Sequence, residues 1–183
     1  MWIHQSSPGT ISAAFEEMQG SSDRAAGIVA SAIVEDHLTT ALKSRFHHDE
    51  PMIRELFKGT GPLAPFSTKI KLAFLLGLLS ARACKDLQTI RRIRNDFAHK
   101  LDKTFETQNI KDMAMNLTVH DWYNVTFSMP NIDNNEKEQE LILIDEETKA
   151  TLDKPRQRYL ATCRCFLAFF TVEPPIVPPT PRF

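Results

Sequence analysis

Two residues of this chain are well suited to do chemistry, Arg94 and His99, and both lie in the segment KDLQTIRRIRNDFAHKL at 85–101. A histidine titrates near neutrality and can move the proton of a ribose 2′-OH. An arginine can hold a phosphate through two hydrogen bonds and stabilise the charge that builds on it. Arg94 and His99 together would therefore suit the cleavage of RNA without a metal ion.

The spacing of the two residues limits this chemistry. On a regular helix Arg94 and His99 lie about 140° apart, so they cannot meet on one face. They could converge if the helix ended near Ala98, or if a two-fold dimer brought two copies of the helix into one cleft. The alternative is structural, with Arg94 and Asn95 making buried hydrogen bonds and His99 capping the helix.

The apolar pattern of the segment predicts the helix itself. Its apolar residues recur every three or four positions and form one face, made of Leu87, Ile90, Ile93, Phe97 and Leu101. Arg94 lies at the edge of this face, where a buried cation needs a partner. We expect that partner in an earlier helix or in a second copy of the chain. The candidate residues for ion pairs are Asp23, Arg24, Glu35 and Asp36. The alternative for these charges is a solvated helix face.

The other elements predict an all-α protein, a single-domain bundle of five to six helices. A first short helix is expected at 11–18, and a long one begins after an N-cap at Ser22. Pro51 fits the first turn of the next helix. A last helix is expected at 155–170. We expect an N-terminal segment at 1–19, a helical domain at 20–172 and a flexible proline-rich tail at 173–183. Residues 118–152 show no clear regular element.

One stretch stands out as nearly all apolar, KIKLAFLLGLLSA, which Ser67 is expected to cap. From Ile70 to Leu79 it has almost no polar face, so it should be the most buried helix of the bundle. Gly77 would then mark a close crossing with another helix. On this reasoning Leu75→Asp should prevent folding.

Charge and composition narrow the classes of function. The 183 residues carry a formal net charge of −1, so any site for nucleic acid must be local. Between Arg82 and Lys103 seven Lys or Arg face three Asp, a modest patch that makes direct DNA binding the weakest hypothesis. No metal-ligand motif or phosphate loop is present, and we expect no cofactor. No apolar run approaches a membrane span, and the three cysteines are expected to be free thiols of a cytoplasmic protein.

Three segments of the chain form a combined pattern: SDRAAGIVASAIVEDHL at 22–38, GPLAPFSTKIKLAF at 61–74 and IRNDFAH at 93–99. Together they resemble the mannitol operon repressor family over residues 20–172. This resemblance implies an all-helical bacterial transcription regulator that lacks a DNA-reading helix-turn-helix and acts through a protein partner, such as another transcription factor. Ser22 and Ala25 depart from the family pattern, and the polar insertion at 131–147 and the tail look additional.

The arginine, asparagine and histidine pattern also resembles the HEPN superfamily, whose catalytic members are ribonucleases with an Arg-x4–6-His motif at a dimer interface. That resemblance would make Arg94 and His99 catalytic and Asn95 supporting. The chain therefore has two expected functions, the partner-binding regulator, which we favour, and the ribonuclease. A shared cleft holding Arg94 and His99 would favour the ribonuclease, and an ion pair from Arg94 to Asp23 or Glu35 would favour the regulator.

Overall fold

A computed structural model describes residues 8–47, 49–118 and 146–172. This part of the chain is helical and holds no strand. Its elements are α1 (Pro8–Gln19), α2 (Asp23–Lys43), α3 (Glu50–Phe57), α4 (Phe66–Leu75), α5 (Ala81–His99), α6 (Gln108–Met115), α7 (Glu146–Lys149) and α8 (Pro155–Val172). The predicted all-α class is confirmed. The tail at 173–183 and the insertion at 131–147, apart from its last two residues, lie outside the described residues.

The predicted count of five to six helices is too low. Seven helices in the described residues have eight residues or more, and α7 adds a single turn. The shortest of the seven, α3 and α6, have eight residues each, fewer than an isolated helix needs in water. Burial of Ile53 and Phe57 in α3, and of Ile110 and Ala114 in α6, stabilises them. Tertiary packing of this kind is hard to predict from the local sequence.

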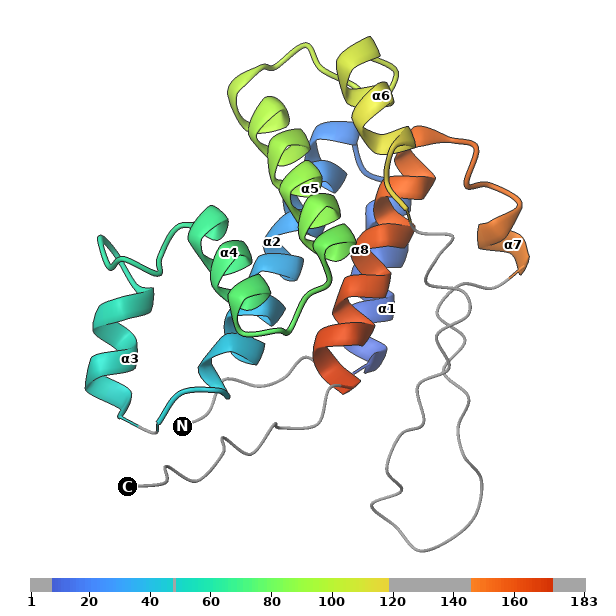
Figure 1. Cartoon of the computed structure of the whole chain (residues 1–183). Helices are drawn as coiled ribbons and strands as arrows, with labels where there is room; N and C mark the ends of the chain where they lie inside the picture. The colour runs from blue at the N-terminus through green and yellow to red at the C-terminus, as the bar shows by residue number, and fades with distance from the viewer. Residues whose placement is uncertain (1–7, 48, 119–145, 173–183) are drawn as a thin grey trace, which may run out of the picture.

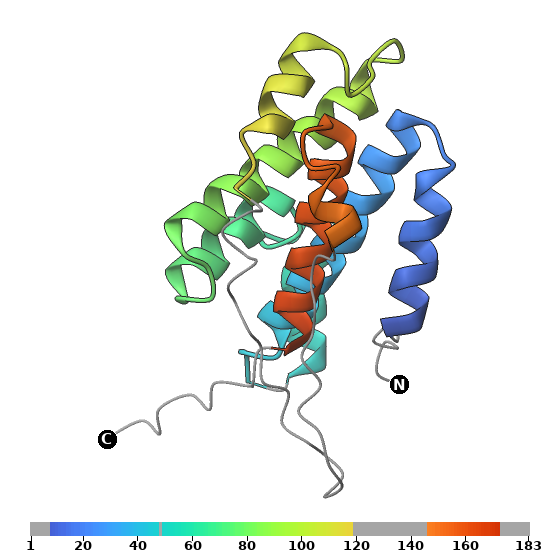
Figure 2. The ribbon, with the colours of Figure 1, turned by 90° about the vertical axis from the view of Figure 1, so that its right-hand side faces the viewer.

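The core forms around α2 (Figures 1 and 2). This helix packs against α8, α5 and α4, while α6 packs against both α5 and α8, and α1 lies along one flank of α2. Its buried face contains Ala26, Ala30, Val34, Leu38 and Leu42, none of which is exposed. The N-cap prediction at Ser22 is confirmed, because the Ser22 side chain accepts a hydrogen bond from the Ala25 amide.

The closest packing lies where α2 crosses α5, at Gly27. A Cβ atom on Gly27 would lie 2.4 Å from Cδ2 of Phe97, so only glycine fits there. Phe97 in turn packs edge-on against Phe105, with ring centroids 5.0 Å apart. From the other side, the buried Tyr159 hydroxyl donates a 2.7 Å hydrogen bond to the Gly27 carbonyl. This crossing fixes α2, α5 and α8 relative to one another.

The expectation for the apolar stretch at 70–79 is wrong. Helix α4 already ends at Leu75, and Leu75 is 79% exposed. Gly77 has a φ of +74°, and the Leu78 amide donates to the Ala73 carbonyl at 2.9 Å, which is the hydrogen bond of a Schellman motif. Gly77 therefore ends the helix instead of allowing a close crossing. The N-cap is Pro65, so the cap predicted at Ser67 is also wrong.

The segment that contains Arg94 and His99 is helical, but its bounds differ from the predicted ones. Helix α5 starts at Ala81, after Ser80 accepts a hydrogen bond from the Ala83 amide, and it ends at His99. Leu87, Ile90, Ile93 and Phe97 are fully buried, as the apolar pattern predicts. Leu101 follows the helix and is 79% exposed. No helix in the described part of the chain is long and apolar enough to cross a membrane.

Candidate functional site

The geometry of α5 does not bring Arg94 and His99 together within one chain. The helix is continuous through His99, so the two side chains keep their separation of about 140° around its axis. Arg94 is half-buried and donates to Oδ1 of Asn95 at 3.4 Å, whereas His99 is exposed. The idea that the helix ends between the two residues is therefore wrong.

Two of the acidic residues expected to pair with Arg94 pair with other cations. Asp23 pairs with Arg156 on α8 at 2.6 Å, and Glu35 pairs with Lys69 on α4 at 2.8 Å. Asp36 is exposed. Asp23 and Glu35 therefore pair with cations from α8 and α4, and not from α5. Removal of the Arg94 side chain would leave neither of these carboxylates without its partner.

Asp23 and its neighbour Arg24 instead form a junction between helix ends. Arg24 donates to the carbonyls of Phe97 and Ala98, at 2.8 and 3.4 Å, and so caps the C-terminal end of α5. Asp23 accepts the Phe105 amide at 2.8 Å through one carboxylate oxygen and Arg156 through the other. These contacts tie the start of α2 to the end of α5 and the loop that follows it.

Arg156 completes this junction from the first turn of α8. Its Nη2 donates to the carbonyl of Ser21 at 2.9 Å and to that of Met18, close to the C-terminal end of α1. No local sequence pattern predicts this role, because Arg156 and Asp23 are 133 residues apart. The junction is structural, since its polar groups already bind one another and the helix ends.

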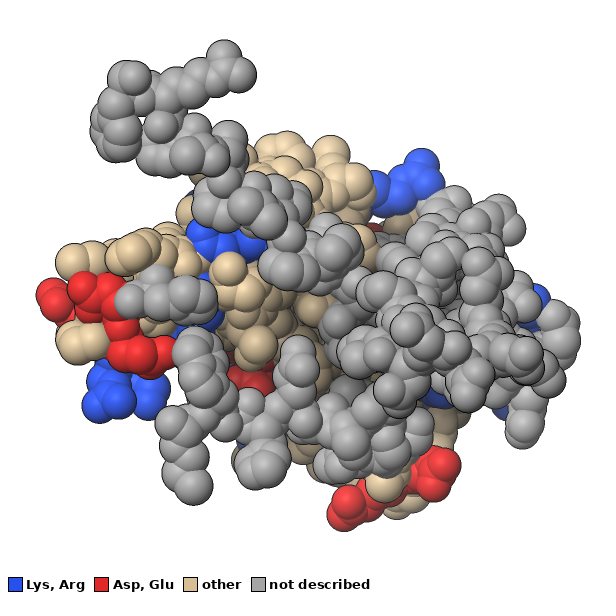
Figure 3. Space-filling model, turned by 90° about the horizontal axis from the view of Figure 1, so that it is seen from below, with Lys and Arg blue, Asp and Glu red and all other residues tan. Residues whose placement is uncertain are grey.

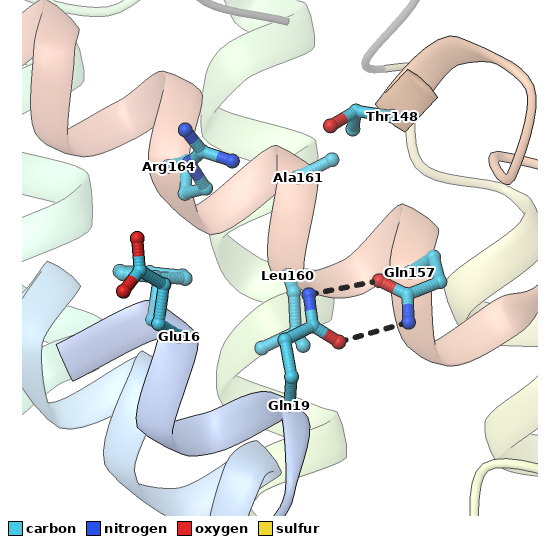
Figure 4. Close-up of a pocket in the computed structure, with 8 residues that line it drawn as sticks. Glu16, Gln19, Thr148, Gln157, Leu160, Ala161 and Arg164 are labelled. Atoms are coloured by element: carbon cyan, nitrogen blue, oxygen red, sulfur yellow. Dashed lines mark hydrogen bonds between the residues drawn. The ribbon is translucent and has the colours of Figure 1, made fainter. Parts of the chain in front are cut away.

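A shallow pocket between α1, α7 and α8 does not offer a better site (Figure 4). Glu16 and Arg164 lie on opposite sides of it, and Gln19 and Gln157 bond each other through two amide hydrogen bonds of 3.0 and 3.3 Å. Its volume is about 120 Å³, well below the few hundred Å³ of most ligand pockets. The amide pair mainly joins α1 to α8.

The described residues also lack the groups for metal or thiol chemistry. No cluster of three or more His, Cys, Asp or Glu in this part of the chain could hold a metal ion. The three cysteines are free, as the sequence predicts. Burial raises the pKa of the Cys165 thiol to about 12 and raises that of Cys163 as well, so neither is a thiolate near neutral pH.

The end of α4 and the start of α5 present a different kind of surface, which sequence reasoning placed in the core. Phe74, Leu75 and Leu76 are 43%, 79% and 44% exposed and consecutive. Two exposed lysines, Lys71 and Lys85, lie within nine residues of this run along the chain. We call these five residues the α4–α5 surface.

Comparison with known proteins identifies the fold and the family. A search of the solved structures finds an X-ray structure of the MtlR–HPr complex from Escherichia coli, which matches with a TM-score of 0.59 and 15% identity over 87% of this chain and 97% of that one. At this identity the match shows the shared fold. No curated protein sequence matches the chain. The MtlR family model, described as mannitol repressor, matches residues 13–171. The chain is a member of the MtlR mannitol repressor family.

Proposed function

We propose that this protein is a transcription regulator of the mannitol repressor type that works by binding a protein partner. The observation that carries the proposal is the match of the family model over residues 13–171, which include the whole described core. The ribonuclease hypothesis has no such support, because a single chain holds Arg94 and His99 on different sides of an intact helix.

The charges of α5 favour a protein partner over direct binding to DNA. Lys100 pairs with Asp96 at 3.1 Å, and the Arg91 side chain donates to Gln88 at 3.1 Å. A protein that grips DNA needs Lys and Arg free to neutralise several phosphates. The charge of Lys100 is thus paired within the chain, and the formal net charge of −1 adds no attraction for DNA.

The solved structure with the same fold suggests the first partner to test, since it is a complex with HPr. The experiment is a calorimetric titration of purified HPr from the source bacterium into the full chain. We expect saturable binding with a defined stoichiometry. A mobility-shift assay with mannitol operon control DNA should show no specific shift with the chain alone. Specific DNA binding by the chain alone, with no binding of HPr or any other protein, would refute the proposal.

A further inference from the structure

We propose that the α4–α5 surface is the docking site for an acidic protein, one that offers an apolar hollow to Leu75 and carboxylates to the surrounding cations. This inference rests on the proposed function and adds the location of the contact and the chemistry of the partner. Two independent features of the surface support it, the exposed apolar side chains and the sign of the charges around them.

Leu75, at the centre of the apolar run, contributes little to the core. Leu78 and Leu79, just after Gly77, are 3% and 4% exposed and fill the core, whereas Leu75 is 79% exposed. The Schellman motif at Gly77 turns the chain so that residues before the turn face outward and those after it face inward. A run of three exposed large apolar residues on a monomer commonly marks a site of interaction. A few residues near the centre of such a site carry most of the binding energy.

The charges near these residues are of one sign. From Leu56 to Lys85 the sequence has five Lys or Arg and no Asp or Glu. Lys69 is neutralised by Glu35, whereas Lys71 and Lys85 are exposed. Seen from below, uncharged surface lies beside Lys and Arg near the middle of the molecule, and acidic surface appears both near the middle and toward the rim (Figure 3).

The next acidic residue along the chain is buried. Asp86 is 1% exposed, and its carboxylate accepts hydrogen bonds from the amide and hydroxyl of Thr118, at 3.0 and 2.7 Å. Burial raises the pKa of the Asp86 carboxyl, and the charges of Lys85 and Arg82 oppose this shift. The carboxylate thus faces Thr118 within the chain, while Lys71 and Lys85 contribute positive charge at the exposed surface that a partner meets.

The positive charge of the surface also favours a different protein as the partner over a second copy of this chain. A two-fold contact would place the α4–α5 surface of one chain against the same surface of the other. Lys71 and Lys85 would then face the same two lysines of the other copy, and like charges brought together in an interface cost several kcal/mol. A partner with carboxylates around an apolar hollow instead gains from both features of the surface.

The chain offers a matched control for testing this surface. Leu101 is also 79% exposed, but it follows the other end of α5, about 28 Å along the helix axis. Leu75→Asp and Leu101→Asp make the same chemical change at equal exposure. Both variants should keep the wild-type circular dichroism spectrum and unfold cooperatively, because neither side chain fills the core.

The experiment has two steps. A photo-crosslinking amino acid is placed at position 75 or 101 of the full chain in the source bacterium, and proteins joined only at 75 are identified by mass spectrometry. Each is then purified and titrated, beside purified HPr, against the wild type, Leu75→Asp, Leu101→Asp and Lys71→Glu. For the true partner we expect Leu75→Asp to weaken binding at least tenfold and Lys71→Glu to weaken it severalfold. Leu101→Asp should bind as the wild type does, and affinity should fall as salt rises.

The possible failures are distinguishable. If a protein binds the wild type and Leu75→Asp equally well, the partner-binding function stands and the docking site is wrong. The site is also wrong if the adduct at position 75 is a second copy of this chain, or if Lys71→Glu strengthens binding. If no protein binds the wild-type chain, both the site and the proposed function fail.

Discussion

The crossing of α2 and α5 makes a sharp prediction for Gly27→Ala. The added Cβ would lie 2.4 and 2.7 Å from two atoms of the Phe97 ring, closer than any normal contact. The ring cannot easily turn away, because it is fully buried and packs against Phe105 at 5.0 Å between centroids. Separation of the two helices would instead strain the hydrogen bond from Tyr159 to the Gly27 carbonyl.

The size of this effect follows from opposing terms. Replacing glycine by alanine within a helix is worth about 1 kcal/mol in favour of the variant. Overpacking of a core costs about 1–3 kcal/mol, and a weakened hydrogen bond adds about 1 kcal/mol. The free energy of unfolding of Gly27→Ala should therefore fall by about 1–3 kcal/mol. For a protein of this size the melting temperature should drop by roughly 2–4 °C for each kcal/mol lost.

Urea unfolding followed by circular dichroism measures this change. Gly20→Ala is the matched control, because the nearest atom to its added Cβ is the Glu17 carbonyl oxygen at an ordinary 3.9 Å. A double variant, Gly27→Ala with Phe97→Leu, should lose less stability than the sum of the two single changes, since the smaller side chain relieves the clash. If Gly27→Ala were as stable as the wild type, the described packing of α2 on α5 would be wrong.

Three further predictions concern other parts of the core. Arg156→Ala should lower the free energy of unfolding by about 2–4 kcal/mol in urea, because it leaves Asp23 and the end of α1 without their donor. Because burial raises the pKa of the Asp86 carboxyl in the folded state, its contribution to stability is greatest below the unfolded pKa and is lost as pH rises through the folded value. Asp86→Asn should remove this part of the pH dependence of unfolding. Cys165, with a pKa of about 12, should resist iodoacetamide at pH 8 until urea unfolds the chain.

The sequence predicted most elements whose signals are local. The N-cap at Ser22 and the buried stripe from Leu87 to Phe97 follow from capping chemistry and helical periodicity. The burial predicted for the apolar stretch that includes Leu75 was wrong, because hydropathy reports the composition of a segment and not how far it is buried in the fold. Gly77 adopts a left-handed conformation that ends α4 and leaves Leu75 exposed. From composition alone, a glycine that ends a helix looks the same as a glycine at a helix crossing.

The candidate ion pairs show a second limit of the sequence. Asp23 and Glu35 do form ion pairs, but with Arg156 and Lys69 and not with Arg94. Which cation reaches which carboxylate depends on how α4 and α8 dock against α2, and the local pattern of α5 contains no information about that docking. For the same reason the contact between Phe97 and Gly27 could not be predicted, because a glycine within a helix does not indicate which side chain packs against it.

The central claim, that this member of the mannitol repressor family acts through a protein partner at the α4–α5 surface, is tested most directly by one titration. Purified HPr, or the protein crosslinked at position 75, is titrated by calorimetry into the wild type, Leu75→Asp and Leu101→Asp. The account predicts saturable binding to the wild type and Leu101→Asp, and at least tenfold weaker binding to Leu75→Asp. Equal binding to all three chains would contradict the docking site, and absence of binding to the wild type would contradict the function itself.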